Sequence, residues 1–297
     1  MTLEARQPAA AGAVHRAGWV VAAPDRILRD GYVAVAGGRI TSIGEGRGFP
    51  KDLPVTDHGP GALLPPLVNA HTHLELSALA GRLPLDRGFR EWVRCLIETR
   101  AALDSEALAR GAEAGIAALA AGGCGVVGEV STLGITWKLL RDSGLSGVWF
   151  QEFLGSPDDA PLPEQPDAPP LLTAAVAGHA PHTTDPAWLV RLKSQANGRR
   201  RPFSIHLDES DDEAAFLETG QGAWADFLAT RGIDFSGWPL PADGPVTYAD
   251  RLGLLDPGTL AVHLLRTRRP TFDLLRRRGC HVCICPRSNQ NLHNRLP

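Results

Sequence analysis

The sequence predicts an α/β fold, a TIM-type (β/α)₈ barrel that is preceded by a small β-sheet domain. From residue 63 onward, short apolar runs of strand type alternate with segments of helical periodicity, which is the pattern of a parallel sheet. Polar residues follow at the carboxyl ends of these runs, where barrels of this kind carry their active sites. The predicted barrel strands are residues 67–73, 124–130, 147–153, 174–180, 202–207, 260–264 and 280–285.

Residues 1–62 are predicted to form the small sheet domain, and residues 63–297 the barrel. Short β-type runs lie at 18–21, 32–35 and 39–43. The dipeptides Asp30-Gly31 and Gly37-Gly38 are typical of tight turns, so we expect these runs to form an antiparallel sheet. The alanine-rich residues 1–13 are expected to be a frayed end.

Helices are expected between the barrel strands. Apolar residues recur at helical spacing between Phe89 and Ala101. Ser105 is expected to cap a second helix, which ends before Gly122-Gly123. A stretch rich in proline and acidic residues predicts a surface loop over 155–170. Further helices are predicted over 136–141, 186–194, 211–218 and 271–278, with one short helix inside 219–250.

The composition is that of a globular protein. Of the 297 residues, 43% are hydrophobic and 21% are charged, which is enough apolar material for a sizeable core. The net charge of −3 gives no reason to expect a nucleic acid or a membrane surface as partner. The five cysteines are an odd number and do not resemble a disulfide framework. With no signal peptide or bilayer-spanning apolar run, we expect a cytoplasmic protein that binds a small-molecule substrate and is open to forming a homo-oligomer.

A His-x-His pair ends the first barrel strand. Alternate side chains of a strand share a face, so His71 and His73 point the same way and can bind one transition metal. A bare pair of this kind is more often two surface histidines. Here, however, further polar residues hold the same position near the ends of other strands. They are Glu129, Glu152, His179, His206 and His263.

One carboxylate stands out beside this histidine set. Glu209 follows His206 by three residues, so it can lie beside a metal that His206 binds without being a ligand itself. A carboxylate in that position can take a proton from water and pass it to a leaving group.

Four segments together resemble the amidohydrolase superfamily, and most closely its metal-dependent deaminase and chlorohydrolase branch. They are residues 68–75 around His71 and His73, residues 206–210, residues 260–263 ending in His263, and residues 285–289 from Cys285 to Asn289. The resemblance extends from about Val14 to the end of the chain. The continuation after His73 and the segment 286–289 look most like aminodeoxyfutalosine deaminases, with S-adenosylhomocysteine and adenosine deaminases close behind.

The resemblance implies a role for each matching residue. It implies one divalent metal, most simply Zn²⁺ with Fe, Mn or Ni as alternatives, held by His71, His73 and His206. Glu209 is implied to be the proton shuttle, and His263 to orient the attacking water. The residues implied to face the substrate are His179, Glu75, Trp92, Ser288 and Asn289, although packing is an equal alternative for Glu75 and Trp92.

The resemblance also implies the reaction. A deaminase of this branch converts the 6-amino group of an adenine-type base into a 6-oxo group and releases ammonia; an aminodeoxyfutalosine deaminase does so in menaquinone synthesis. Two alternatives stay open. One is another C–N or C–Cl hydrolase of the superfamily, and the other is an inactive product or pseudoenzyme.

Some features depart from the family pattern. The family has an eighth barrel strand with a metal-binding aspartate, whereas this sequence ends soon after the seventh, so we expect a barrel that is truncated there with open strand edges. Pro66 and His182 stand where the family usually has glycine and an aromatic residue. The spacing of Cys280 and Cys283, close to Cys285, is compatible with a second metal site, but a place in a core strand favours a packing role.

Overall fold

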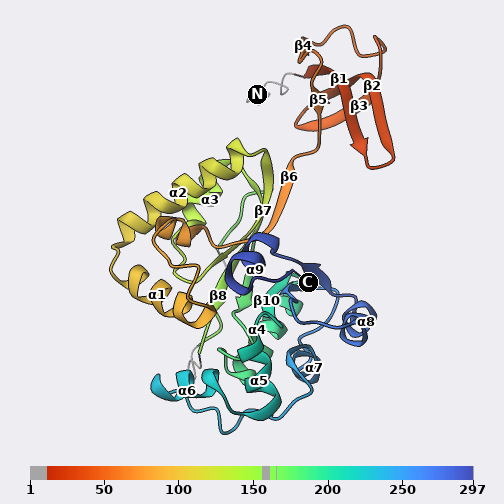
Figure 1. Cartoon of the computed structure of the whole chain (residues 1–297). Coiled ribbons are helices and arrows are strands. Elements are labelled where there is room, and N and C mark those ends of the chain that lie inside the picture. The colour runs from red at the N-terminus through yellow and green to blue at the C-terminus, as the bar shows by residue number, and fades with distance from the viewer. Residues whose placement is uncertain (1–11, 156–160, 165, 297) are drawn as a thin grey trace, which may run out of the picture. The chain divides into compact units, whose positions relative to one another are not determined.

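The computed structural model describes residues 12–155, 161–164 and 166–296 (Figure 1). The chain divides into two compact units, one up to Pro66 and the other from Leu67 onward. The expected frayed end falls almost entirely on residues 1–11, which lie outside the described part. Within that part, no helix is both long and apolar enough to cross a membrane.

The first unit is a five-stranded sheet. Strands β1 (Ala13–Ala23), β2 (Arg26–Ala36) and β3 (Arg39–Glu45) are antiparallel, as the sequence predicts. Two short strands, β4 (Val55–Asp57) and β5 (Ala62–Leu63), pair with β1 in the parallel sense, so the sheet is mixed.

The prediction that Asp30-Gly31 forms a hairpin turn was wrong. The turn between β1 and β2 lies at residues 24–25, and Gly31 lies within β2, opposite Ala17. Asp30 has a φ of 44°, but the pairing with β1 keeps the same register on both sides of it, so β2 continues through the dipeptide without a reversal. A Cβ atom on Gly31 would lie 2.6 Å from the Cγ2 atom of Val20, which explains the glycine by packing. The second turn, at Gly37-Gly38, is where the sequence predicts it, and both residues have a positive φ.

The second unit confirms the predicted fold class, with seven parallel barrel strands that are hydrogen-bonded in chain order. The fifth, sixth and seventh of these strands are neighbours in the sheet and run parallel, so their carboxyl ends lie at the same edge. The strands are β6 (Leu67–Thr72), β7 (Cys124–Ser131), β8 (Ser146–Phe153), β9 (Leu172–Gly178), β10 (Phe203–Leu207), β11 (Thr259–His263) and β12 (His281–Cys283).

Two strands end two residues earlier than the sequence suggests. β9 ends at Gly178, so His179 lies just beyond the strand. β12 ends at Cys283, because Pro286 begins a helix and Cys285 is its N-terminal capping residue. Proline fits the first turn of a helix, where its missing N–H has no partner to lose.

Helices connect the strands. The predicted short helix within 219–250 is in fact two helices, and neither the 3₁₀ helix η1 nor the last helix α9 was predicted. Ser105 is not a cap, because the Asp104 side chain accepts the hydrogen bond from the Ala107 amide at 2.7 Å. The helices are η1 (Leu74–Leu79), α1 (Phe89–Ala101), α2 (Ser105–Ala121), α3 (Thr136–Ser143), α4 (Pro186–Gly198), α5 (Asp211–Thr219), α6 (Ala223–Thr230), α7 (Pro245–Arg251), α8 (Arg269–Arg278) and α9 (Pro286–His293).

The predicted surface loop over 155–170 is only partly described. Residues 161–164 and 166–169 have no regular structure, in keeping with the prediction. Residues 156–160 and 165 of that loop lie outside the described part.

Burial is greatest in the middle of the barrel sheet. All five residues of β10 are buried, and its Phe203 and Ile205 pack with Leu189 and Leu192 of α4. Its apolar residues Phe203, Ile205 and Leu207 belong to this core and alternate along the strand with the buried Ser204 and His206.

The outer strands of the barrel sheet are much more exposed than β10. Leu67 and Val68 of β6 are 60% and 64% exposed, and Val282 of β12 is 44% exposed. Among the described residues, β6 pairs only with β7, and β12 only with β11. The open edges that the sequence leads us to expect are therefore present in this sheet.

We expect Gly147→Ala to destabilise the barrel by about 2–5 kcal/mol, the sum of a strained backbone and an overpacked contact. Gly147 has a φ of 136°, and a Cβ atom there would collide with the carbonyl oxygen of Val127 on β7. Gly144→Ala is the matched control, since Gly144 also has a positive φ but no atom within 4 Å of its added Cβ. Urea unfolding followed by circular dichroism measures both, and equal losses would contradict the collision.

A second prediction concerns Asp256, which ties α4 to the start of β11. It accepts hydrogen bonds from Lys193 Nζ at 2.6 Å, Asn197 Nδ2 at 2.8 Å and the Gly258 amide at 2.7 Å. Burial acts to raise the pKa of Asp256, but these hydrogen bonds outweigh it and lower the pKa below 3.8. The stabilisation is therefore complete above pH 3.8 and is lost as the pH falls through the lower folded-state pKa.

Asp256→Asn should accordingly lower the free energy of unfolding at pH 7 more than at pH 3. Urea titrations of the wild type and the variant at both pH values measure the difference. Asp226→Asn, at an exposed position of α6, is the control and should show no such pH dependence. A loss for Asp256→Asn that is the same at both pH values would contradict the assignment.

Candidate functional site

The predicted site residues converge at the carboxyl ends of the barrel strands. His71 lies near the end of β6, His206 lies in β10, and His263 is the last residue of β11. They open into a cavity of about 1080 Å³, which also contacts His73, His179, Glu209, Glu75, Trp92 and Ser288.

Three imidazoles form the centre of the site. His206 Nε2 lies 3.2 Å from His73 Nε2 and 3.2 Å from His71 Nε2. The other ring nitrogen of His206, Nδ1, lies 2.7 Å from the carbonyl oxygen of His179, to which it donates its proton. That hydrogen bond leaves a lone pair on His206 Nε2, directed at the other two rings. His73 is oriented in the same manner, by a hydrogen bond to the backbone of Val130.

Burial keeps these imidazoles neutral. It lowers the pKa of His73 to about 3 and of His206 to about 4, and the pKa of His71 falls well below its usual value, with repulsion among the rings adding to each effect. The neutral imidazole is the form that binds metals. The ligand nitrogens of all three residues lie within 4.8 Å of one another. This donor set fits a divalent ion such as Zn²⁺, which binds three histidines and leaves a fourth position open.

Glu209 lies beside the histidines in the loop after β10. Its side chain is buried, with Oε1 3.6 Å from His263 Nε2 and 3.5 Å from His293 Nε2. Burial acts to raise the pKa of Glu209, but the neighbouring imidazoles of His263, His293 and His206 outweigh it and hold the pKa well below its usual range. Glu209 is therefore ionised and ready to accept a proton.

A second carboxylate holds that loop in place. Glu213 is fully buried at the start of α5 and accepts hydrogen bonds from the backbone amides of Asp208, at 3.1 Å, and Glu209, at 2.7 Å. Asp208 has a φ of 56°, an uncommon conformation for a residue with a side chain. The two hydrogen bonds thus stabilise a strained backbone next to the candidate proton shuttle.

His263 is also held in an uncommon conformation, with a φ of 75°. Its Nδ1 lies 3.0 Å from Asn289 Oδ1, so the ring donates to the amide oxygen and turns Nε2 toward Glu209. Asn289 is fully buried and is not among the residues that line the cavity. The predicted substrate contact for Asn289 is therefore replaced by a positioning role, whereas Ser288 does face the cavity.

The remaining predicted residues surround the cavity. Glu75 is 1% exposed and is held by the Ser131 hydroxyl at 2.9 Å and the Thr132 amide at 3.0 Å, so its carboxylate orders the loop after β7. Trp92 of α1 belongs to the apolar wall, and His179 faces the cavity with Nδ1 2.6 Å from Thr183 Oγ1. Contact of these residues with a substrate stays a prediction.

The two strand-end glutamates have different surroundings. Both oxygens of Glu129 accept from the Leu74 amide, at 3.2 and 2.9 Å, which fixes the chain directly after His73. Glu152 Oε1 lies 3.6 Å from His206 Nδ1 and has no hydrogen-bond partner among the described residues. Burial raises the pKa of Glu152 to about 8.

Sequence reasoning missed two residues of the site. His293 contacts Glu209 only because α9 folds back over the cavity, and the motif over 285–289 covers the start of that helix but stops short of His293. Arg100, near the end of α1, also lines the cavity. It is one of three arginines in that amphipathic helix, and nothing in the sequence separates it from the other two.

Comparison with known proteins adds family evidence to this geometry. The sequence profile of the amidohydrolase family matches residues 62–296. The 5-methylthioadenosine/S-adenosylhomocysteine deaminase of Nitratidesulfovibrio vulgaris is 28% identical over 284 residues, covering 90% of this chain and 59% of that protein. The aminodeoxyfutalosine deaminase of Deinococcus radiodurans is 28% identical over 287 residues, covering 88% of this chain and 66% of that protein. The chain thus spans about 59–66% of the length of these two relatives.

The fold also matches a solved structure. The aminofutalosine deaminase of Helicobacter pylori, crystallised in complex with methylthio-coformycin, superposes with a TM-score of 0.81 at 24% sequence identity. The match covers 95% of this chain and 72% of that one. At this level of identity, the likeness shows a shared fold.

We expect His73→Ala to weaken Zn²⁺ binding at the tightest site. The loss of affinity should exceed the roughly 10–100-fold that follows when a residue hydrogen-bonded to a metal ligand is removed. The substitution removes one of three converging nitrogens and leaves the strand intact. Competition with a chromophoric chelator measures the affinity. His281→Ala, at an exposed position of β12, is the control and should bind Zn²⁺ as the wild type does. Wild-type affinity in His73→Ala would rule out the three-histidine site.

Proposed function

The chain belongs to the amidohydrolase family, and on that premise we propose that it is a metal-dependent hydrolytic deaminase of an adenine-type base. The reaction replaces the 6-amino group by a 6-oxo group and releases ammonia. One observation carries the proposal: an ionised, buried Glu209 and three neutral imidazoles face the same large, mainly apolar cavity. A base can enter such a cavity, and hydrolysis needs both a proton carrier and an activated water.

His71, His73 and His206 would hold the metal, most simply Zn²⁺, which supplies Lewis-acid chemistry and lowers the pKa of water toward about 7. The protein groups perform the proton transfers. Glu209 accepts one proton of the attacking water and delivers it to the ring nitrogen, and then carries the second proton of the same oxygen to the departing amine. Its buried position keeps the carboxylate aimed at the reacting atoms and excludes bulk water.

His263 complements Glu209 in this proposal. The hydrogen bond between its Nδ1 and Asn289 fixes the ring so that Nε2 points into the site. From there it can accept a hydrogen bond from the attacking water and so orient it. Asn289 acts through His263 and is a positioning residue.

The cavity wall suits a flat heteroaromatic ring. Phe89 and Trp92 of α1 both line it, and their rings are nearly parallel with centroids 6.1 Å apart. Aromatic faces of this kind bind bases by stacking without strong sequence or substituent preference. His179 and Ser288 add polar groups that can hydrogen-bond to ring or sugar atoms.

For the substrate itself, we propose aminodeoxyfutalosine as the first compound to test, which would place the protein in menaquinone synthesis in the cytoplasm. Support comes from two similar proteins. One is named as a deaminase of 5-methylthioadenosine and S-adenosylhomocysteine, and the other as an aminodeoxyfutalosine deaminase. 5-Methylthioadenosine, S-adenosylhomocysteine and adenosine follow as candidates. Another C–N or C–Cl hydrolase activity, tested with an s-triazine, and an inactive protein remain the alternatives.

The test is ammonia release by the zinc-loaded chain with each of these compounds. We expect ammonia from at least one 6-aminopurine compound. Turnover of the s-triazine with no ammonia from any 6-aminopurine would contradict the deaminase proposal and favour another C–N or C–Cl hydrolase activity. No turnover of any compound would favour the inactive alternative.

We expect Glu209→Gln to lower kcat by about 10²–10⁴-fold, the usual contribution of a general acid–base group, because an amide cannot carry the proton. Zinc content should be unchanged, since Glu209 is not one of the converging ligands. Glu218→Gln, at an exposed position of α5, is the control and should keep full activity. Full activity in Glu209→Gln would remove the carboxylate from the mechanism.

A further inference from the structure

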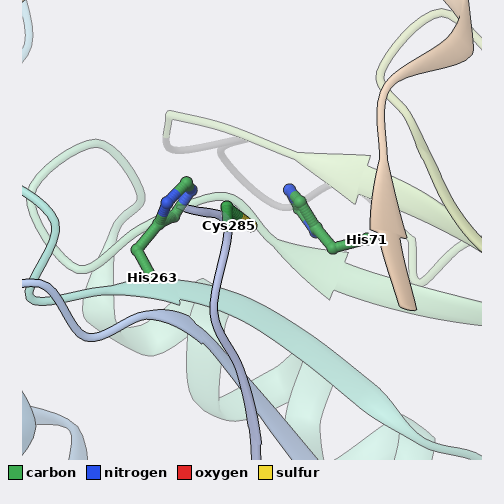
Figure 2. A group of neighbouring side chains, drawn as sticks. All are labelled: His71, His263 and Cys285. Atoms are coloured by element: carbon green, nitrogen blue, oxygen red, sulfur yellow. The ribbon is translucent and has the colours of Figure 1, made fainter. Parts of the chain in front are cut away.

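A second group of potential metal ligands lies beside the three-histidine cluster. Cys285, His71 and His263 each offer one ligand atom, and these atoms lie within 4.8 Å of one another. Figure 2 shows the Cys285 side chain between the rings of His71 and His263. All three residues line the same cavity, so an ion can reach them from solvent.

The position of Cys285 differs from what the sequence suggested. Cys280 packs against the apolar core, in agreement with a structural role. Cys285, however, lies two residues beyond the end of β12 and faces the cavity. Among the described residues, neither Cys280 nor Cys283 belongs to a group of metal-ligand type. The thiol of interest is therefore Cys285.

The nitrogens of the two imidazoles are available to a cation. His263 uses Nδ1 to bind Asn289, which leaves the lone pair on Nε2. His71 Nε2 faces His206, but its Nδ1 is buried and has no hydrogen-bond partner among the described residues. A buried ring nitrogen without a partner is uncommon and calls for a ligand. Glu209 Oε1, 3.6 Å from His263 Nε2, adds negative charge beside the group.

The chemistry of this group differs from that of the first cluster. One sulfur and two imidazole nitrogens favour thiophilic ions such as Zn²⁺, Co²⁺ and Cd²⁺ over Mg²⁺ and Ca²⁺, which prefer oxygen. Ligand distances of about 2.3 Å for sulfur and about 2.0–2.1 Å for nitrogen place ligand atoms roughly 3.5 Å apart around a tetrahedral ion. Atoms already within 4.8 Å need only small side-chain rotations to reach that geometry.

We propose that Cys285, His71 and His263 form a second metal site, with a sulfur ligand, that takes a thiophilic divalent ion and shares His71 with the three-histidine cluster. Binding replaces the S–H proton of Cys285 by a metal–sulfur bond and the Nδ1 proton of His71 by a metal–nitrogen bond, because His71 Nε2 faces the three-histidine cluster; both protons pass to solvent. An ion at this site occupies His263 Nε2 within the cavity, so it excludes substrate. Thiophilic ions in excess of the single ion that the three-histidine cluster binds should therefore inhibit the protein.

Co²⁺ titration of the full-length chain tests the proposal, because a sulfur-bound Co²⁺ gives a near-ultraviolet charge-transfer absorption that histidine-bound Co²⁺ lacks. The wild type should develop this absorption, and Cys285→Ser should lose it. Cys124→Ser is the control, since Cys124 also lines the cavity, lies outside the group and directs its thiol to the carbonyl oxygen of Val126. It should keep the absorption. His73→Ala should also keep it, because His73 belongs only to the other cluster.

Three results would overturn the proposal: no sulfur-to-cobalt absorption at saturating Co²⁺, an absorption that survives in Cys285→Ser, or an equal loss in Cys124→Ser. Circular dichroism confirms that each variant is folded, and Cys285→Ala replaces Cys285→Ser if the latter does not fold. The absorption does not depend on catalysis. Absent ammonia release with an intact absorption would count against the deaminase proposal alone.

Discussion

The convergence of three neutral imidazoles is the constraint on which the rest of the site depends. Their lone pairs repel one another at the 3.2 Å separations seen between His206 and its two neighbours unless a proton or a cation lies between them. Burial makes protons scarce there, as the lowered pKa values of His73 and His206 show. The arrangement persists because the parallel sheet holds β6 and β10 in place and a backbone carbonyl fixes the ring of His206.

Buried carboxylates hold the loops that carry this site. Glu75, Glu129 and Glu213 each accept backbone N–H groups from a segment that follows a barrel strand. These amides have no strand partner at that level, so without the carboxylates they would be buried and unsatisfied. The acids therefore act through the backbone, and they set the directions of the loops that bear His73 and Glu209.

The sequence was sufficient for the parts of the fold that depend on local pattern. The seven barrel strands are apolar runs of the expected length, and His71, His206 and His263 follow from their positions at strand ends. The prediction of a turn at Asp30-Gly31 was wrong because the same dipeptide can also lie within a strand, and only the pairing of β1 with β2 decides between the two.

The parts of the site that depend on long-range packing could not be predicted. Asn289 was expected to face the substrate, but α9 turns it toward His263. The contact between His293 and Glu209 depends on the same helix, which begins directly after the predicted strand, where the sequence predicted no helix. The predicted packing role of Cys285 was wrong for a similar reason. At the start of α9 it reaches the cavity, whereas within a strand it would pack in the core.

Three neighbouring residues of the site, Asp208, His263 and Leu264, have positive φ values that are unfavourable for residues with side chains. Glycine would relieve this strain at each position. A directed-evolution experiment that selects only for heat resistance should therefore enrich glycine at position 263 and remove the imidazole that faces Glu209. Histidine at position 263 therefore carries a cost in backbone strain, and the imidazole that this cost maintains is the one bound to Asn289 beside Glu209.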